Sequence, residues 1–291
     1  MQPAPRIQGI NCIQTLSNDT VLVDHGPMRM FISVFDNGKP LIDLAREGGY
    51  LALKVLEDLA NFLPVIKRKT RAIEIREFFP DVVRKMIEAT WEMDEPDLTP
   101  LAAVAGAASD VVADFLISQG GTKVIVDNGG DIAIRLKGEE VVRVGVKAEI
   151  EARNPAYVIP LDIAAKIGGV ATSGLGGRSF TKGIASAATV LAKDAALADA
   201  AATVIGNFTN VEDPRISRSL AEKIYPDTDI PGEWVTVHVG SLSQEKIDEA
   251  LMKGLSKANS LRENELIQGA LIAVQGKIVW TESIDPFIVK L

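Results

Sequence analysis

The 291-residue chain is long enough to bury a substantial core, and its 31 Lys and Arg residues against 39 Asp and Glu residues give a net charge of −8. This acidic balance argues against a polyanionic partner, so we expect no nucleic-acid binding. A single cysteine excludes an internal disulfide framework, and two histidines leave no Cys/His zinc site with recognisable spacing.

The sequence carries no recognisable targeting or membrane segment. Residues 1–14, MQPAPRIQGINCIQ, lack an apolar core of signal-peptide length, and we expect no apolar run long enough to span a bilayer. We therefore expect a cytoplasmic protein without a membrane partner, whose residues 1–291 form a single domain.

Hydrophobic periodicity predicts strands followed by helices at the start of the chain. The predicted elements are two strands within 20–35, a turn at 36–40, and helices at 49–67 and 79–93. An acidic linker with prolines follows, and Thr99 and Pro100 suit the N-cap and the first position of a helix that runs to Gly120. This helix is so rich in Ala and Gly over 102–108 that another backbone or a ligand should approach closely there.

The second half of the chain mixes strands and helices without strict β-α-β alternation. The predicted elements are a hairpin at 122–136, a strand at 138–146 that continues its sheet, a strand at 186–192, a helix at 196–207, a loop at 225–234, a strand at 234–242, a helix at 243–261 and a hairpin about Gln275-Gly276. This mixture predicts an α+β fold with a mixed or largely antiparallel sheet and packed helices.

The helix at 196–207 contains Asp199 and, four positions later, Thr203. Four residues advance an α-helix by about 400°, so the two side chains lie within roughly 40° of each other on one face. Their oxygens could hold one hard cation such as Mg²⁺, which prefers oxygen ligands and is often bound by one or two protein groups plus phosphates. The alternative is that Thr203 bonds to the carbonyl one turn earlier while Asp199 faces solvent.

Two glycine-rich segments supply donors of the kind that anions accept. Glycines let backbone N–H groups converge on an anion, and hydroxyl and guanidinium groups add further donors. The alternatives are a plain hairpin turn for the first segment and a mobile surface loop for the second. The candidate ligand-binding residues are Asn128, Gly129, Gly130 and Asp131 in the first, and Thr172, Ser173, Gly174 and Arg178 in the second.

The order of these motifs over about residues 99–207 resembles that of the ApbE flavin transferase superfamily. The chain shows a small-residue helix with A-S-D, then N-G-G-D, A-T-S-G and A-D-A-A-A-T. The resemblance implies an ApbE-like (T-fold-like) fold, and a magnesium site made by Asp199, Thr203 and the carbonyl of Ala105. It also implies a pocket for FAD lined by N-G-G-D and A-T-S-G, and transfer of FMN from FAD to a threonine of an acceptor protein.

The chain departs from the superfamily at two places. Ala105-Gly106-Ala107 replaces an A-K-G stretch, so its lysine is missing, and the H-x-x-D-P-x-T-G segment before the metal helix is absent. Both histidines lie outside that interval, and Lys182 or Ser179 would be poorly matched substitutes for a proton-transfer group. No catalytic residue can therefore be assigned, and FMN transfer is expected to be weak or absent.

Two functions follow from this pattern, which is most similar to the cytoplasmic ApbE-like branch. The first is a magnesium-assisted pocket for a flavin or another nucleotide, with transferase-like chemistry if the protein is an enzyme. The second is a non-catalytic accessory protein in sulfur assimilation or cofactor metabolism. Cys12 could relay sulfur in the second function, although a lone cysteine in a strand is more often a small buried hydrophobe. The substrate, the acceptor and the formation of a homodimer stay open.

Overall fold

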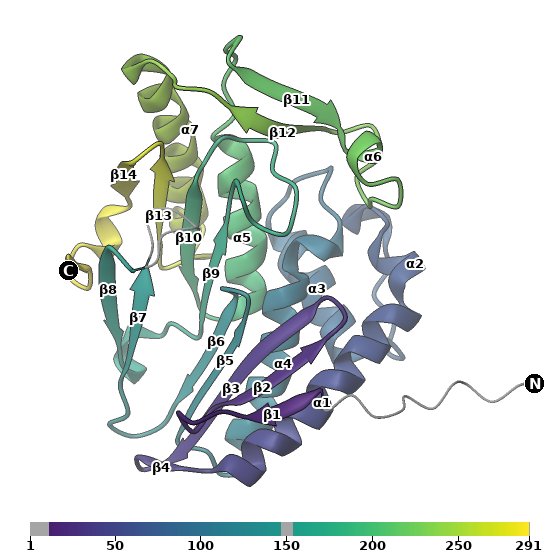
Figure 1. Cartoon of the computed structure of the whole chain (residues 1–291), viewed down its shortest axis with the longest axis vertical. Coiled ribbons are helices and arrows are strands. Elements are labelled where there is room, and N and C mark those ends of the chain that lie inside the picture. The colour runs from purple at the N-terminus through teal and green to yellow at the C-terminus, as the bar shows by residue number, and fades with distance from the viewer. Residues whose placement is uncertain (1–11, 147–153, 291) are drawn as a thin grey trace, which may run out of the picture.

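The computed structural model describes residues 12–146 and 154–290, which fold into a large sheet covered by helices (Figure 1). The main sheet has ten strands in the order β1-β2-β3-β5-β6-β9-β10-β13-β14, with β4 attached to β3, and each of its pairings is antiparallel. The predicted α+β class with a largely antiparallel sheet is confirmed.

The elements of the first half are β1 (Ile13–Thr15), β2 (Val21–His25), β3 (Met28–Asp36), β4 (Lys39–Pro40), α1 (Ile42–Asn61), α2 (Leu63–Ile66), α3 (Asp81–Glu92), η2 (Pro100–Ala103), α4 (Val104–Ser118), β5 (Lys123–Asn128), β6 (Ile132–Leu136) and β7 (Val142–Val146). Those of the second half are β8 (Tyr157–Leu161), β9 (Gly169–Ser173), β10 (Ala187–Ala192), α5 (Ala195–Phe208), β11 (Ile216–Leu220), α6 (Ala221–Ile224), β12 (Trp234–Val239), α7 (Gln244–Glu263), β13 (Gly269–Val274), β14 (Lys277–Trp280) and β15 (Val289–Lys290).

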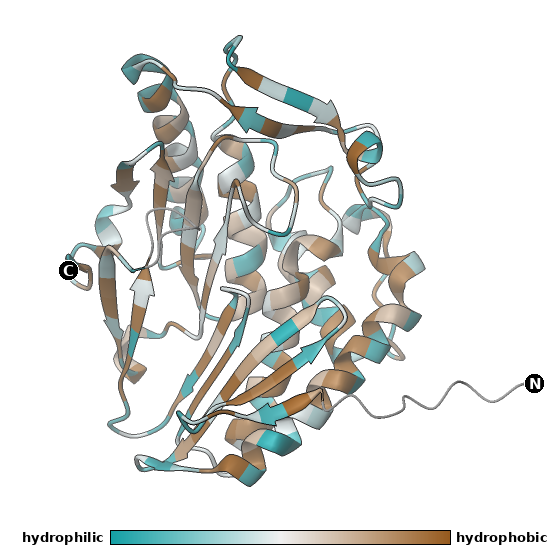
Figure 2. Cartoon of the chain, viewed as in Figure 1, coloured by the Kyte–Doolittle hydropathy of each residue, from teal (hydrophilic) through white to brown (hydrophobic). Residues whose placement is uncertain are grey.

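The larger core lies between the main sheet and the helices. Alternate residues of β3, Met30, Ile32 and Val34, are buried on the face of the strand that α1 covers, as the alternation of the sequence requires. Figure 2 shows mostly pale and brown residues on the visible part of α4, in keeping with its contacts with β5, β6 and α5. A second core lies on the opposite face of the main sheet, where Val144 and Ile159 of β7 and β8 pack against it.

One strand lies in a different sheet from the one predicted. Residues 142–146 form β7, but β7 pairs with β8 in a separate three-stranded sheet with β15 rather than continuing the hairpin of β5 and β6. The alternation of apolar residues is the same for either sheet, so the sequence pattern could not distinguish them.

The helix predicted after Thr99 begins differently. Pro100–Ala103 form a 3-10 turn, and α4 begins only at Val104. The Thr99 hydroxyl does not cap either element; it donates to the carboxylate of Asp229, far along the chain. Thr99 therefore occupies the predicted N-cap position, before the 3-10 turn and with Pro100 at its first residue, but its side chain makes no capping bond because a tertiary partner engages it.

The segment Pro100–Ser118 corrects the expectation that no apolar run reaches bilayer-spanning length. By length and composition it could cross a membrane, with a mean hydropathy of 1.6, although half of its residues are buried within the described structure. It packs against β5, β6 and α5, which are the contacts of a core helix.

The close approach predicted over 102–108 is present between α4 and α5. A Cβ atom at Gly106 would lie 2.1 Å from the carbonyl oxygen of Ala195. On the other side of α5, a Cβ atom at Gly169 of β9 would lie 2.2 Å from the carbonyl oxygen of Asp194. The start of α5 is therefore held between two glycines, which fixes the position of the helix that carries Asp199.

The C-terminal third of the chain is built into the same sheet. β13 pairs with β10, β14 extends the sheet beyond it, and α7 packs against α5 and β13. By contrast, β11 and β12 form a two-stranded sheet of their own, next to α6 and the loop after it.

Candidate functional site

A cavity of about 1750 Å³ opens at the end of the main sheet where the predicted site residues meet. Its wall is formed by the start of α4, by α1, by the β5–β6 turn, by β9 and the loop after it, by α5, and by residues 224–230. The wall includes every residue that the sequence suggested: Ala105, Asn128, Gly129, Gly130, Asp131, Thr172, Ser173, Gly174, Arg178, Asp199 and Thr203.

Asp199 joins α5 to the first turn of α4. Its Oδ2 accepts the N–H of Gly106 at 3.0 Å, so the carboxylate satisfies one of the amides that a helix start leaves without an intrahelical partner. Burial raises the pKa of Asp199 to about 7, although hydrogen bonds from the Gly106 and Ala105 amides partly oppose this rise. Asp199 thus does not face bulk solvent on an outer surface, which was the alternative interpretation.

Thr203 lies one turn further along α5, on the same face. Its Oγ1 is 3.5 Å from the carbonyl oxygen of Ala102, a distance at which a hydrogen bond is weak. The hydroxyl is therefore poorly satisfied within the protein, and its contact is to η2 rather than to its own helix. A cation next to Asp199 would find this oxygen within the same part of the cavity.

The carbonyl implied as a third metal ligand is already engaged. The Ala105 carbonyl oxygen accepts the Ser109 hydroxyl at 3.0 Å, since Ala105 lies inside the first turn of α4. The carbonyl of Ala102 precedes that helix and lies next to Thr203, so it is a further candidate oxygen ligand.

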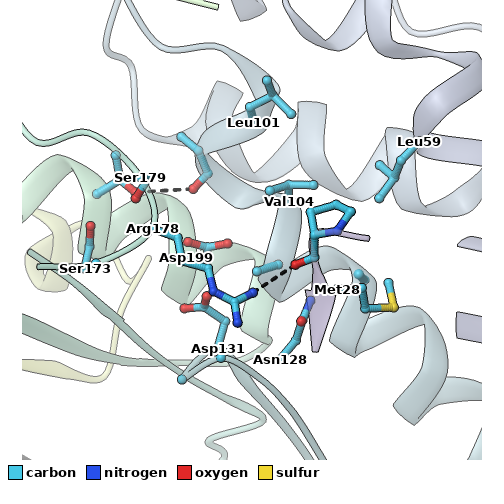
Figure 3. Close-up of a pocket in the computed structure, with 18 of the residues that line it drawn as sticks. Met28, Leu59, Leu101, Val104, Asn128, Asp131, Ser173, Arg178, Ser179 and Asp199 are labelled. Carbon is cyan, nitrogen blue, oxygen red and sulfur yellow. Dashed lines mark hydrogen bonds between the residues drawn. The ribbon is translucent and has the colours of Figure 1, made fainter. Parts of the chain in front are cut away.

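A second carboxylate, Asp131 of the β5–β6 turn, lies close to Asp199. Burial, then the charges of Asp199 and Asp127, raise the pKa of Asp131 well above its usual value. A hydrogen bond from the backbone amide of Thr172 and the charge of Arg178 lower the pKa of Asp131. Both residues belong to the second glycine-rich segment, so that segment lies beside the carboxylate of the first. Figure 3 shows Asp131, Asp199 and Arg178 together on one side of the cavity.

Arg178 is the cationic group best placed to bind an anion. The described cavity wall contains two lysines, and both are ion-paired: Lys67 with Asp227, and Lys182 with Asp97 and Glu233. Arg178 instead donates from Nη1 to the neutral carbonyl of Pro27 at 2.9 Å. Its guanidinium also lies over Gly129, where a Cβ atom would come within 3.7 Å of it. The carbonyl orients the guanidinium without neutralising it.

The opposite side of the cavity is apolar. α1 contributes a stripe of side chains at helical spacing, and Met28, Leu101 and Val104 complete the wall, as Figure 3 shows. The stripe consists of Tyr50, Leu53, Leu56 and Leu59, and Leu63 of α2 continues it. A flat or apolar body joined to a polar tail would match both sides of this cavity.

The donor set fits a magnesium ion better than it fits a softer metal. Among residues 12–146 and 154–290, no three His, Cys, Asp or Glu side chains gather closely enough to hold a metal by themselves. The candidate ligands are all oxygens, from Asp199, Thr203 and the Ala102 carbonyl. The pKa values of Asp131 and Asp199 are raised, and a cation bound beside them would lower these values by favouring the charged carboxylates. Mg²⁺ commonly has few protein ligands and completes its shell with water and phosphate oxygens.

Neither candidate substitute for the family histidine is arranged as a base. The ion pairs of Lys182 with Asp97 and Glu233 raise the pKa of its ammonium despite its partial burial, so it stays protonated. Ser179 lines the cavity, but a serine hydroxyl does not accept a proton at neutral pH without a further base. His238 lies in β12, paired with Ser217 of β11.

Cys12 and His25 line the far end of the cavity. The Cys12 Sγ atom lies 3.3 Å from Nδ1 of His25, and Cys12 precedes β1 and is only partly buried. Its interpretation as a buried hydrophobe within a strand is therefore wrong, because Cys12 lies just before β1 and lines the cavity.

A family model described as AbpE bacteria matches residues 13–280, nearly the whole described chain. The chain belongs to this ApbE-like family. A UPF0280 protein of Methanosarcina barkeri is 35% identical over 181 residues, which cover 62% of this chain and 69% of that protein. A second UPF0280 protein, from Methanococcus maripaludis strain C6, is 30% identical over 194 residues, or 64% of this chain and 77% of its own.

A solved structure supports the same assignment at the level of the fold. A mutant of the flavin transferase ApbE from Vibrio cholerae superimposes on the present chain with a TM-score of 0.52. The superposition covers 92% of the present chain and 98% of the Vibrio cholerae chain. The two sequences are only 14% identical, so this similarity shows a common fold and nothing about the reaction.

The structure also explains one departure from the superfamily and reveals residues that the sequence did not single out. At Gly106, where the superfamily lysine was aligned, no side chain fits, because the Cβ atom would overlap the Ala195 backbone. The Ala102 carbonyl and the α1 stripe were not predicted as parts of the site. The helical spacing of the stripe signals an apolar face, but nothing in it distinguishes a cavity wall from a core.

Proposed function

We propose that this ApbE-like protein binds a flavin nucleotide, FAD, as its magnesium complex. The observation that carries the proposal is the meeting of opposite charges in one cavity. Arg178 offers a guanidinium whose bond is to a neutral carbonyl, and Asp131 and Asp199 offer carboxylates with raised pKa values beside it. Wherever they ionise, these carboxyl groups would repel a diphosphate alone, whereas a diphosphate carrying a divalent cation complements both the carboxylates and the guanidinium.

The chain's own residues would divide the binding between them. Asp199, Thr203 and the Ala102 carbonyl would hold the cation, while Arg178 and the amides of the glycine-rich segments would hold phosphate oxygens. The apolar wall of α1 would take a flat ring and exclude water from it. Bound magnesium would neutralise the phosphates and polarise the bond between phosphorus and its leaving oxygen.

The cavity is large enough for such a ligand. Drug-sized ligands occupy sites of about 300–1000 Å³, and the volume of about 1750 Å³ exceeds that range. The space beyond a bound dinucleotide is open to part of an acceptor, and in the proposed reaction this is an acceptor protein that presents a threonine.

Transfer of FMN to that threonine should nevertheless be slow. A positioned base contributes typically about two to four orders of magnitude to such a step, because a threonine hydroxyl is a poor nucleophile at neutral pH. Lys182 is held in ion pairs and Gly106 leaves no room for a lysine. These two observations favour the second candidate function, a non-catalytic accessory protein in sulfur assimilation or cofactor metabolism that keeps the fold without the transfer chemistry.

Fluorescence titration of FAD tests the binding proposal. We expect the wild type to bind FAD more tightly with magnesium than without it, and Asp199→Ala to lose this difference. Curves that are the same with and without magnesium would remove the cation from the proposal. Incubation with FAD and a threonine-bearing acceptor tests the reaction, and rapid covalent flavinylation would show that the accessory function is wrong.

A further inference from the structure

The first turns of α4 and α5 cap each other through two aspartates. Asp199 of α5 accepts the N–H of Gly106 at the start of α4. In return, Asp110 of α4 accepts the N–H groups of Ala195 and Ala196 at the start of α5, at 3.1 and 2.8 Å. Each helix thus receives a carboxylate at its positive end, where an anion is favoured.

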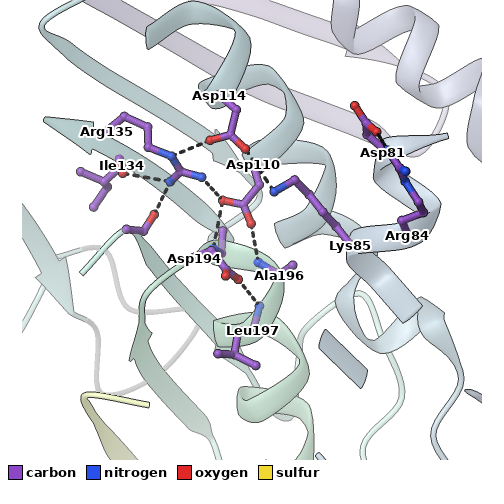
Figure 4. Close-up of polar contacts among 12 residues, drawn as sticks. Asp81, Arg84, Lys85, Asp110, Asp114, Ile134, Arg135, Asp194, Ala196 and Leu197 are labelled. Atoms are coloured by element: carbon purple, nitrogen blue, oxygen red, sulfur yellow. Dashed lines mark hydrogen bonds and ion pairs between the residues drawn. The ribbon is translucent and has the colours of Figure 1, made fainter. Parts of the chain in front are cut away.

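Asp110 is fully buried and ion-paired with Arg135, and Lys85 pairs with the neighbouring Asp114. Arg135 of β6 donates from Nη2 to Asp110 at 2.8 Å and from Nε to Asp114 at 2.8 Å (Figure 4). Its Nη1 donates to the carbonyl of Gly168 at 2.9 Å, next to the glycine that packs against the start of α5. Arg135 therefore ties α4, β6 and the residue before β9 together at the point where α5 begins.

The two caps lie on one face of α4, because Gly106 and Asp110 are four residues apart. The contacts of Asp110 with Ala195 and Ala196 set the position of α5 along α4, and the same position brings Asp199 to the Gly106 amide. Thr203, one turn beyond, then meets the Ala102 carbonyl. A shift of α5 along α4 would separate these oxygens.

We infer that Asp110 and Arg135 are positioning residues for the magnesium site formed by Asp199, Thr203 and Ala102. This inference rests on the proposed function. Neither residue lines the described cavity wall, so both act only through the placement of α5. Residues that orient metal ligands without touching the metal typically change its affinity by about 10–100-fold when they are replaced.

Binding of Mn²⁺, followed by the electron paramagnetic resonance signal of the free ion, tests the inference on the full-length protein. We expect Asp110→Asn to raise the dissociation constant about tenfold or more. Arg135→Lys, a milder change, keeps a positive charge but loses the fork that joins Asp110 to Asp114, and it should act in the same direction. Measurement well below each variant's unfolding temperature keeps loss of folded protein out of the comparison.

Gly254→Ala is the matched control. It crowds Thr209 and Ile272 where α7 packs on the other side of α5, so it lowers stability without touching the two caps. We expect its dissociation constant for Mn²⁺ to stay within about twofold of the wild type. Equal affinity in Asp110→Asn, Arg135→Lys and wild type would overturn the positioning role while leaving the proposed function intact.

A second measurement needs no metal, and it distinguishes failure of the positioning role from failure of the proposed metal site. In ¹⁵N-glycine-labelled protein, the Gly106 amide should exchange its hydrogen faster in Asp110→Asn and Arg135→Lys than in wild type, relative to the Gly254 amide. Unchanged Gly106 exchange would contradict the positioning role whether or not metal binds. Absence of Mn²⁺ binding by the wild type, with faster Gly106 exchange in the variants, would instead reject the proposed metal site alone.

Discussion

Gly106→Ala is the substitution whose effect the structure defines most closely. The new Cβ atom would lie 2.1 Å from the Ala195 carbonyl oxygen and 2.9 Å from the Ala196 nitrogen, and a backbone atom cannot rotate away. Overpacking of this kind costs about 1–3 kcal/mol, and we expect the upper end, about 3 kcal/mol. The better helix propensity of alanine offsets about 1 kcal/mol, so the expected net loss of unfolding free energy is about 2 kcal/mol.

Thermal unfolding measures this loss. For a chain of this size, 1 kcal/mol corresponds to about 2–4 °C, so Gly106→Ala should lower the unfolding temperature by about 4–8 °C. Gly48→Ala is the matched control: it also lies buried within a helix, but its Cβ would meet only the flexible end of Leu116 at 3.0 Å, and it should change stability far less. Equal unfolding temperatures for the two variants would refute the close packing of α4 on α5.

Two further predictions concern the cavity. Arg178→Ala should weaken binding of FAD in the presence of magnesium by about tenfold or more, because a hydrogen bond to a charged group contributes about 1.5–3 kcal/mol. Arg29→Ala, which removes an exposed arginine, is the control and should leave this affinity unchanged. Calorimetric titration measures both dissociation constants, and equal affinities of the two variants would contradict the prediction. Asp97 is partly buried, which raises its pKa, but the hydrogen bond and charge of Lys182 outweigh this effect and hold the pKa below its usual value. Its stabilising contribution is therefore present above pH about 4 and lost as the pH falls through the folded-state pKa, so unfolding temperatures of wild type and Asp97→Asn should converge below pH 4. A gap that stays constant down to pH 3 would speak against this ion pair.

Local periodicity was enough to predict most of the fold. The hairpin through Asn128-Gly129-Gly130 and the strand before α5 depend on turn chemistry and alternation over a few residues, which the sequence displays directly. α1 was predicted to begin at residue 49 but begins at Ile42, because its first two turns contain polar residues that weaken the apolar pattern.

Contacts between residues distant in the sequence determine features of the site that local periodicity does not predict. Thr99 has the residue type and position of an N-cap, yet Asp229 engages its hydroxyl from 130 residues away. The Ala105 carbonyl was implied as a ligand, and the fold adds a contact that the pattern did not predict, because from inside the first turn of α4 it also accepts the Ser109 hydroxyl. Both contacts depend on where a 3-10 turn ends and a helix begins, which composition does not fix.

The helical spacing of Asp199 and Thr203 predicted their common face, but not the surface that this face meets. That surface is set by Gly106, Asp110 and Arg135, which join three elements distant in the sequence. A buried arginine balanced by two aspartates has no local signature, so the contacts that position the candidate site emerge only from the folded structure.

A crystal structure of the protein soaked with FAD and Mn²⁺ would test the central claim most directly, because manganese gives an anomalous signal. We predict one anomalous peak at coordination distance from Asp199 and Thr203, about 2 Å, with the diphosphate between that peak and the Arg178 guanidinium. The flavin ring should then lie against the α1 side of the cavity. Bound FAD without a metal peak at Asp199, or a metal peak elsewhere with the cavity empty, would contradict the account.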